Sequence, residues 1–571
     1  MAGRLSTVST LALAAAMVVV RTPDTVRIAA QSQPPTTAPS AERAAATGNA
    51  PAATHDARYK RLLIKNAMVI YGNTKPPYGP MDILIENGLI ARITPSRGAD
   101  GPAPPGVPPS VRPDAVIDAA GKYVMPGIVN THMHWHEERM PGIPMPIQYE
   151  RHLYLASGST TVREVGGDVD KTNLWRKQSA EHTIVAPRII NYPTLPNVVG
   201  SKRTFDRSPA GIRAVVREAK ARGVDGLKLS AYDRDQLEAL MDEAKIAGLP
   251  STVHVGVEET TAKDYVELGV GCIEHFYGVA DAALDGIQNF PPEHNSNNEI
   301  HRFGRAGELY IQPNLNPKKL SDLLDLMIQK GTCWSPTMST YEASRDLIKN
   351  QNLPWYKDYL HPSLEEYYKP SMLRHGTYWI GWTNTQEVRW RQNYRVWMDA
   401  LREFGVKGGL ITTGDDAGYL YGSLYGFGMI RELELQEEAG FHPIEVLNHA
   451  TWNGARALGL GDKLGKVRVG YIADLLVVNG NPLENLRVLN PYGVDVMLVD
   501  GKPVNSYSAV DLAAARSVTN GHGGGIEWTI KDGIPWHVPT LMREVKDMVE
   551  KARAELRSKP KPSETSSRQQ P

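Results

Sequence analysis

One apolar stretch ends in alternating histidines: Val124-Met125-Pro126-Gly127-Ile128-Val129-Asn130-Thr131-His132-Met133-His134-Trp135-His136. Side chains alternate along a β-strand, so His132 and His134 point to the same side and can bind one metal ion together. An H-x-H pair alone is weak evidence for a metal site, because histidine is also common as a hydrogen-bonded residue in half-buried strands. The rest of the chain decides between the two interpretations.

This stretch opens a repeating pattern that covers residues 127–462. Eight apolar segments alternate with segments of helical periodicity, and they span residues 128–134, 160–165, 187–192, 226–230, 250–255, 271–276, 331–338 and 409–413. Short buried strands that alternate with helices over this length are typical of an α/β protein with a (β/α)8 TIM barrel, in which all strands are parallel. We therefore predict such a barrel.

Shorter alternating runs flank the predicted barrel on both sides. Residues 58–126 contain apolar runs punctuated by glycine, proline and asparagine, and strand periodicity returns over 463–510. These segments predict a small β-sandwich domain built from chain before and after the barrel. We expect the hairpin Val494–Val504 to complete its sheet. Residues 511–571 predict a hairpin near 531–533, a helix near 541–556 and a disordered tail, and indicate no function.

The first thirty residues have the pattern of a secretory signal peptide. Arg4 precedes an apolar run from Leu11 to Val20, and the small residues Ala29 and Ala30 follow. That run is short for a membrane-spanning helix, so we expect cleavage of residues 1–30 and no stable membrane insertion afterwards; an uncleaved anchor is the alternative. Residues 31–57 are rich in Pro, Thr, Ala and Ser and predict a disordered linker. The expected location is periplasmic or extracellular.

Composition excludes several classes of protein. The chain has 571 residues, of which 41% are hydrophobic and 22% charged, as expected for a globular protein large enough for two domains. Lys plus Arg equals Asp plus Glu at 63 each, so no net field recruits nucleic acid or an anionic membrane. Cys272 and Cys333 are too few for a disulfide scaffold, and we expect both to be buried free thiols.

Polar residues recur where the predicted strands end, which is the face of a (β/α)8 barrel that carries the chemistry. They are His132 and His134 after strand one, Lys228 in strand four, His254 after strand five, Glu274 and His275 after strand six, and Gly414-Asp415-Asp416-Ala417-Gly418 after strand eight. Four imidazoles, a lysine and a carboxylate at one mouth form a set of nitrogen and oxygen ligands that suits zinc or a similar divalent ion.

Over about residues 60–505 the chain resembles the metal-dependent amidohydrolase superfamily. Residues 124–134 are similar to its P-G-x-x-D-x-H-x-H opening, and residues 464–482 to its closing K-L-G-x-x-x-x-G-x-x-A-D-L-x-V signature. Segments 158–167, 223–228 and 269–275 are similar to the imidazolonepropionase-like and prolidase-like branch. Members of that branch hydrolyse dipeptides, N-acylated amino acids and related amides.

The resemblance implies two divalent ions, zinc being the expected metal. His132, His134 and Asp416 would hold one ion, His254 and His275 the other, and a carboxylated Lys228 would bridge them. A lysine ammonium cannot bind a cation, but CO2 converts a desolvated lysine into an anionic carbamate. A hydroxide that bridges the ions would attack the scissile carbonyl, with Asp416 as general base and then general acid.

Several residues depart from the pattern or leave choices open. Asn130 stands where the family has aspartate, and Asp415 competes with Asp416 for the ligand role, which register favours for Asp416. His136 and Tyr232 are candidates for substrate contact, although Tyr232 is also consistent with packing. Residues 279–310 and 341–402 are insertions, and the second is dense in Trp and Tyr. Its rings predict either a lid over an apolar substrate or an ordinary mini-core.

These observations predict a secreted binuclear metal-dependent hydrolase that cleaves a carbon–nitrogen bond in a small-molecule or dipeptide-like substrate. The alternative is a lactone or ester hydrolase, phosphotriesters included, because the same attack applies to those centres. A metal-free binding protein of the same fold is a third interpretation, and the complete ligand set argues against it. The sequence leaves the exact substrate and the oligomeric state open, including a homo-oligomer.

Overall fold

The computed structural model describes residues 50–96, 113–200, 204–256, 260–288, 290–296, 298–371, 374, 376–504 and 510–558. The predicted signal peptide and most of the predicted linker lie outside the described residues, as does the predicted tail beyond residue 558. In the described part of the chain, none of the helices combines the length and the apolar composition needed to span a membrane.

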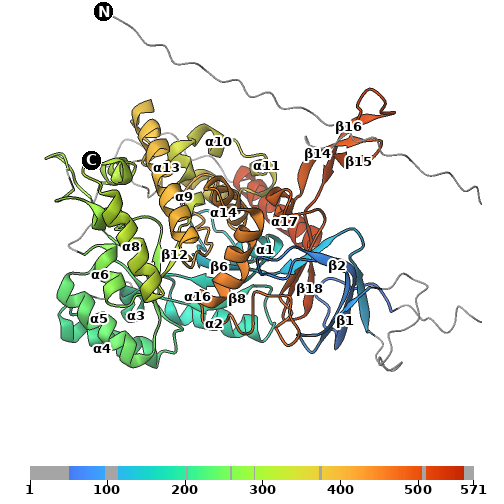
Figure 1. Cartoon of the computed structure of the whole chain (residues 1–571), viewed down its shortest axis with the longest axis horizontal. Coiled ribbons are helices and arrows are strands. Elements are labelled where there is room, and N and C mark those ends of the chain that lie inside the picture. Colours follow the sequence, from blue (N-terminus) through green and yellow to red (C-terminus); the bar gives the residue numbers. More distant parts are fainter. Residues whose placement is uncertain are drawn as a thin grey trace, which may run out of the picture. The chain divides into compact units, whose positions relative to one another are not determined.

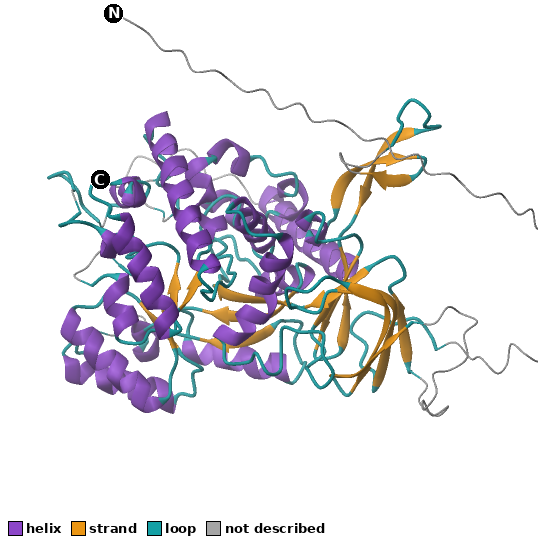
Figure 2. Ribbon diagram, viewed as in Figure 1, coloured by secondary structure: helices purple, strands orange, loops and turns teal. Residues whose placement is uncertain are grey.

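The predicted barrel segments form parallel strands. These are β6 (Ile128–Met133), β7 (Ser159–Glu164), β8 (Arg188–Asn191), β9 (Leu227–Leu229), β10 (Ser251–Val253), β11 (Cys272–Glu274) and β12 (Cys333–Ser335). They pair as two sheets, β6-β7-β8 and β12-β11-β10-β9. With helices around them, the strands make a TIM-barrel-type α/β fold (Figures 1 and 2).

The eighth predicted segment, 409–413, is not a regular strand. It contributes a single parallel bridge between Ile411 and Trp334, and its Thr413 carbonyl accepts a hydrogen bond of 2.8 Å from the Thr131 N–H of β6. Glycines at 408, 409 and 414 bound the segment, and glycine weakens strands. Among the described residues, strand pairing therefore does not close the sheets into one barrel.

Most helices follow the barrel strands along the chain. They are α1 (Ile147–Ala156), α2 (Val169–Ala180), α3 (Leu195–Val199), α4 (Pro209–Ala221), α5 (Arg234–Ala247), α6 (Ala262–Glu267), α8 (Pro317–Lys330), α13 (Asn384–Val406), α14 (Phe427–Glu438), α15 (Pro443–Asn448) and α16 (Gly454–Ala457). In α4 the Ser208 side chain caps the first turn, and Ile212, Val215 and Val216 lie on its buried face. This three- and four-residue spacing places one apolar stripe against the core.

The two insertions add short helices. They are α7 (Glu299–Ala306), α9 (Met338–Arg345), α10 (Leu347–Gln351), α11 (Tyr356–Tyr359) and α12 (Pro362–Tyr367). Trp390, Trp397, Tyr368 and Tyr378 are almost completely buried. Most of the aromatic side chains in the second insertion therefore form an ordinary core, which was one of the two alternatives.

Strands from before and after the barrel share an eight-stranded sheet. It contains β1 (Arg61–Val69), β2 (Tyr78–Glu86), β3 (Leu89–Pro95), β4 (Ala115–Asp118), β5 (Tyr123–Pro126), β13 (Leu475–Val478), β17 (Ile526–Lys531) and β18 (Ile534–His537). Antiparallel pairing of β13 with β5 joins the two parts of the chain. Their alternating apolar residues, such as Ile64, Ile83 and Val124, form a separate core cluster.

The expected role of the hairpin Val494–Val504 is wrong. Its strands β14 (Val494–Val499) and β15 (Lys502–Val504) pair with β16 (Val518–Gly523) in a separate three-stranded sheet. Gly493, Gly524 and Gly525 have positive φ angles and redirect the chain on both sides of that sheet. The segment after residue 511 instead supplies β17 and β18 to the large sheet, and its helix α17 (Val538–Ser558) packs on α1.

The expectation of free thiols is also wrong. A disulfide joins Cys272 of β11 to Cys333 of β12, with the two Cα atoms 4.4 Å apart. The parallel register pairs these residues directly, although 61 positions separate them in sequence. The number of cysteines alone could not show that the pairing of β11 with β12 places Cys272 beside Cys333.

Candidate metal centre

All six predicted metal ligands line one cavity of about 330 Å³. His132 is the penultimate residue of β6 and His134 follows that strand. Lys228 lies in β9, His254 follows β10, His275 follows β11, and Asp416 follows the segment 409–413. The common direction of parallel strands brings these strand ends together. The geometry thus gathers residues that are up to 284 positions apart in sequence (416 minus 132).

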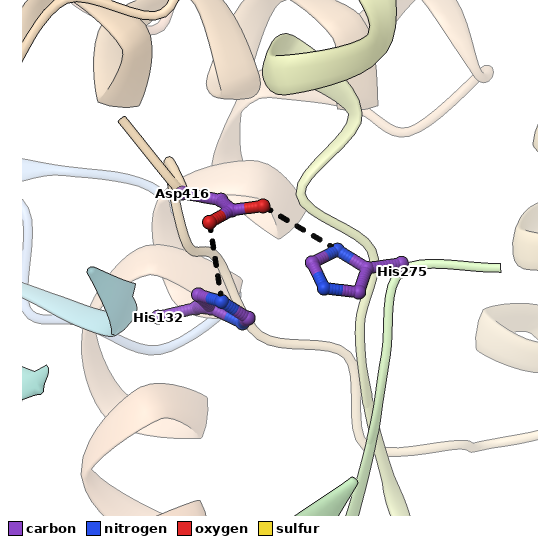
Figure 3. Close-up of side chains that lie close together, drawn as sticks. All are labelled: His132, His275 and Asp416. Carbon is purple, nitrogen blue, oxygen red and sulfur yellow. Dashed lines mark ion pairs between the residues drawn. The ribbon is translucent and has the colours of Figure 1, made fainter. Parts of the chain in front are cut away.

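Asp416 is the centre of the cluster. Its Oδ1 lies 3.4 Å from His132 Nε2 and 3.2 Å from His134 Nε2, and its Oδ2 lies 3.9 Å from His275 Nδ1. One ligand atom from each of His132, His275 and Asp416 lies within 4.8 Å of the others, a spacing that fits a single metal ion (Figure 3). Burial raises the pKa of Asp416, but the nearby imidazoles outweigh it and hold that pKa well below its usual range.

His254 and Lys228 extend the cluster. The His254 ring centroid is 4.7 Å from that of His275, and burial lowers the pKa of both rings well below the usual value, so both offer neutral imidazole nitrogens. The Lys228 amine is buried and makes no hydrogen bond with any described residue. Burial lowers the pKa of Lys228 to about 8, against the opposing effect of Glu274 and Asp416. A buried amine without a partner fits the carbamate that the resemblance implies.

Strained backbone marks the same place. His275, Thr337 and Asp416 have φ angles of +59°, +47° and +43°, in the left-handed region that non-glycine residues rarely adopt. The Thr337 hydroxyl hydrogen-bonds His275 Nδ1, so two of these residues are also in direct contact. Such strain costs of order 1–3 kcal/mol per residue and is typical of functional sites.

The structure separates the two adjacent aspartates. Asp415 points away from the cluster, where it accepts hydrogen bonds from Asn130 Nδ2 at 2.8 Å and from the Gly426 N–H at 3.1 Å. Burial raises the pKa of Asp415 to about 7. Asn130, the residue that departs from the family pattern, is therefore a partner of Asp415. Asp416 is the residue that faces the histidines.

Two buried glutamates support the histidines and were not predicted as site residues. Glu274 accepts a hydrogen bond from His132 Nδ1 at 2.7 Å, and Glu164 Oε1 lies 3.9 Å from His134 Nδ1. Burial raises the pKa of Glu164 to about 8. A glutamate at the end of a fully buried strand was the available signal, because a buried carboxylate needs a partner.

The two predicted substrate contacts lie elsewhere. Among the described residues, neither His136 nor Tyr232 belongs to the cavity wall. The His136 ring hydrogen-bonds the Tyr425 hydroxyl at 3.0 Å, and Tyr232 is buried with the Arg207 guanidinium 5.8 Å from its ring. Direct contact with substrate stays a prediction for both, and this geometry does not support it.

The insertions complete the cavity wall instead. Arg302 and Phe303 come from α7, and Tyr341 comes from α9. Phe303 stacks on Tyr378 with ring centroids 3.9 Å apart, which anchors α7. Arg302 Nη2 lies 3.5 Å from His254 Nε2. The cavity thus combines metal-binding groups, a permanent positive charge and aromatic surface.

The model of the amidohydrolase family matches residues 123–504, which is more than half of the chain and includes every residue of the cluster. The chain belongs to the amidohydrolase family. It is therefore a hydrolase of carbon–nitrogen bonds from a typically metal-dependent family. A search of curated protein sequences finds no match.

Solved structures share the fold of this amidohydrolase at low sequence identity. A bottromycin amidohydrolase has a TM-score of 0.57 and 17% identity, over 87% of this chain and 91% of its own. A Xaa-Pro dipeptidase with bound methionine has a TM-score of 0.54 and 19% identity, over 84% and 100%. The ochratoxinase of A. niger has a TM-score of 0.53 and 16% identity, over 84% and 95%. These likenesses show a shared fold.

Proposed function

We propose that this amidohydrolase is an exported binuclear metallohydrolase that cleaves the amide bond of a small peptide-like or N-acyl amino-acid substrate. The observation that carries the proposal is the convergence of all six predicted ligands on one cavity, with the Lys228 amine buried and unpartnered among the described residues. Hydrolysis at such a cluster needs no further cofactor.

The residues have complementary roles in this proposal. His132, His134 and Asp416 would hold one ion, His254 and His275 a second, and Lys228, carboxylated by CO2, would lie between them. When bound, divalent ions polarise a scissile carbonyl and lower the pKa of a coordinated water toward neutrality. Asp416 would accept a proton from the attacking water and pass it to the leaving amine.

The remaining wall supports the substrate class. The Arg302 guanidinium suits the free carboxylate of an acyl amino acid, because guanidinium and carboxylate pair through two parallel hydrogen bonds. Phe303 and Tyr341 offer apolar surface for the acyl group and help to exclude water from the cavity.

Two further features belong to the same proposal. The Cys272–Cys333 disulfide and the leader pattern of residues 1–30 support export to an oxidising compartment. The single bridges Thr194–Lys228 and Trp334–Ile411 support closure of the two parallel sheets into one eight-stranded barrel. The large sheet would form the small sandwich domain.

Matched substrates test the proposed function. We expect purified enzyme to hydrolyse N-acyl amino acids and dipeptides faster than ester analogues of the same side chains. A chelator should abolish this activity, and zinc with bicarbonate should restore it. Hydrolysis of esters or lactones alone would contradict the amide assignment, and turnover that a strong chelator leaves unchanged would contradict the metal mechanism.

A further inference from the structure

A buried carboxylate below the cavity connects four strands. Glu274 of β11 accepts hydrogen bonds from His132 Nδ1 of β6 at 2.7 Å, from Arg163 Nη2 of β7 at 2.6 Å and from the Thr252 hydroxyl of β10. The side chains of Glu274 and His132 are at most 1% exposed. Glu274 is absent from the cavity wall, so it acts on the site only through its partners.

Arg163 offsets the free-energy cost of burying the charge of Glu274. An unpaired carboxylate in a protein interior costs several kcal/mol. Arg163 is 1% exposed, donates to Glu274, and donates from Nε to the Thr131 carbonyl at 2.6 Å. The ion pair therefore fixes the carboxylate directly beneath His132, and it also holds the backbone of the residue before His132.

This contact has a consequence for the histidine. A ring nitrogen that donates to a carboxylate carries the proton, which leaves the other nitrogen with its lone pair. In His132 the donor is Nδ1, and Nε2 is the atom that faces Asp416 at 3.4 Å. His275 has a different partner, because its Nδ1 contacts the Thr337 hydroxyl. Of the two histidines labelled in Figure 3, His132 is the one whose Nδ1 hydrogen-bonds a carboxylate, and the Nδ1 of His275 hydrogen-bonds a hydroxyl.

We propose that Glu274 is a positioning residue that holds His132 in the tautomer and orientation required for metal binding, with Arg163 as its counter-charge. The inference rests on the metal binding in the proposed function and is independent of the substrate. Glu274 would thus affect metal affinity, and it would do more than stabilise the fold as half of a buried ion pair.

The test is metal affinity of the full chain, measured by competition with a chromogenic chelator for Zn²⁺. Glu274→Gln keeps the shape of the side chain and removes its charge, and we expect roughly 10- to 100-fold weaker binding. Glu432→Gln is the matched control. Glu432 is equally buried, accepts hydrogen bonds from the Ser339 N–H and from Gln436, and does not line the cavity. We expect its metal affinity to equal that of the wild type.

A double variant separates positioning from stability. Glu274→Gln leaves Arg163 buried without its counter-charge, so that variant alone can fail to fold. Arg163→Met with Glu274→Gln removes both charges, and we expect it to recover the wild-type urea midpoint while its zinc affinity stays weak. Wild-type affinity in this double variant or in Glu274→Gln would overturn the positioning role alone. A wild-type chain that binds no divalent metal would overturn the proposed function as well.

Discussion

At the scale of single residues, the site depends on which of two neighbouring aspartates faces inward. The positions of residues at strand ends were enough to list all six predicted ligands that meet in the cavity, because that argument uses only side-chain alternation and strand direction. Strand position also singled out Glu274 but gave it no role, and it could not find Arg302. Glu274 acts from beneath the cavity, and Arg302 arrives on an insertion whose position depends on packing of Phe303 against Tyr378.

Substitution of the two aspartates tests the register. Asp416→Asn should lower turnover roughly 100- to 10,000-fold, the range for loss of a general acid–base group. Asp415→Asn should change turnover far less, because Asp415 contacts Asn130 and Gly426 rather than the histidines. Steady-state kinetics of both variants check this. A larger loss for Asp415→Asn would mean that the register is wrong.

Lys228 distinguishes a binuclear site from a mononuclear one. Lys228→Ala should lose one of the two proposed ions and nearly all turnover, since the variant lacks the side chain that we propose lies between them. A short carboxylic acid added to the variant should partly restore both. Lys531→Met is a control, because Lys531 is also buried but pairs with Asp532 and the Ser179 carbonyl. Two bound ions and normal activity in Lys228→Ala would exclude the bridging role.

At the scale of elements, local periodicity was sufficient where a strand or helix buries one face. The strands from β6 to β12 and the helices α4 and α5 follow from alternation and from three- and four-residue spacing. Periodicity could not assign partners. It placed β14 and β15 in the large sheet, although glycines turn them away, and it missed the strand pairing that unites Cys272 with Cys333.

A buried ion pair joins α9 of the insertion to α14 of the barrel. Glu342 of α9 is 1% exposed and accepts hydrogen bonds from Arg431 of α14 and from Lys349. Burial raises the pKa of Glu342, but Arg431 and Lys349 outweigh burial and lower it from 4.5 to about 2. A carboxyl group whose pKa is lower in the folded state stabilises the fold at pH values above its pKa in the unfolded state. This stabilisation is lost as the pH falls toward the pKa of the folded state.

Glu342→Gln should therefore lower the free energy of unfolding by about 3 kcal/mol near neutral pH, because folding lowers the pKa of Glu342 from 4.5 to about 2. The difference from wild type should shrink as pH falls from about 5 toward 2. Urea denaturation across that range measures it. Asp322→Asn in the exposed Lys318–Asp322 pair should have no resolvable effect. A pH-independent difference for Glu342→Gln would contradict the ion-pair explanation.

At the scale of the whole molecule, export and the disulfide should occur together. We expect the mature native protein to begin near Ala30 and to contain one disulfide between Cys272 and Cys333, because oxidising compartments allow such bonds to persist. Intact-mass spectrometry with and without reduction tests both statements. Retention of Met1 or of residues 11–20 in the native protein would count against export.

We propose that one cavity holds two divalent ions. Elemental analysis of chelator-free protein, purified in the presence of zinc and bicarbonate, tests it most directly. The six converging ligands predict close to two equivalents of metal per chain, and one equivalent after Lys228→Ala. A wild-type chain with no bound metal, and with activity that a strong chelator leaves unchanged, would contradict the account.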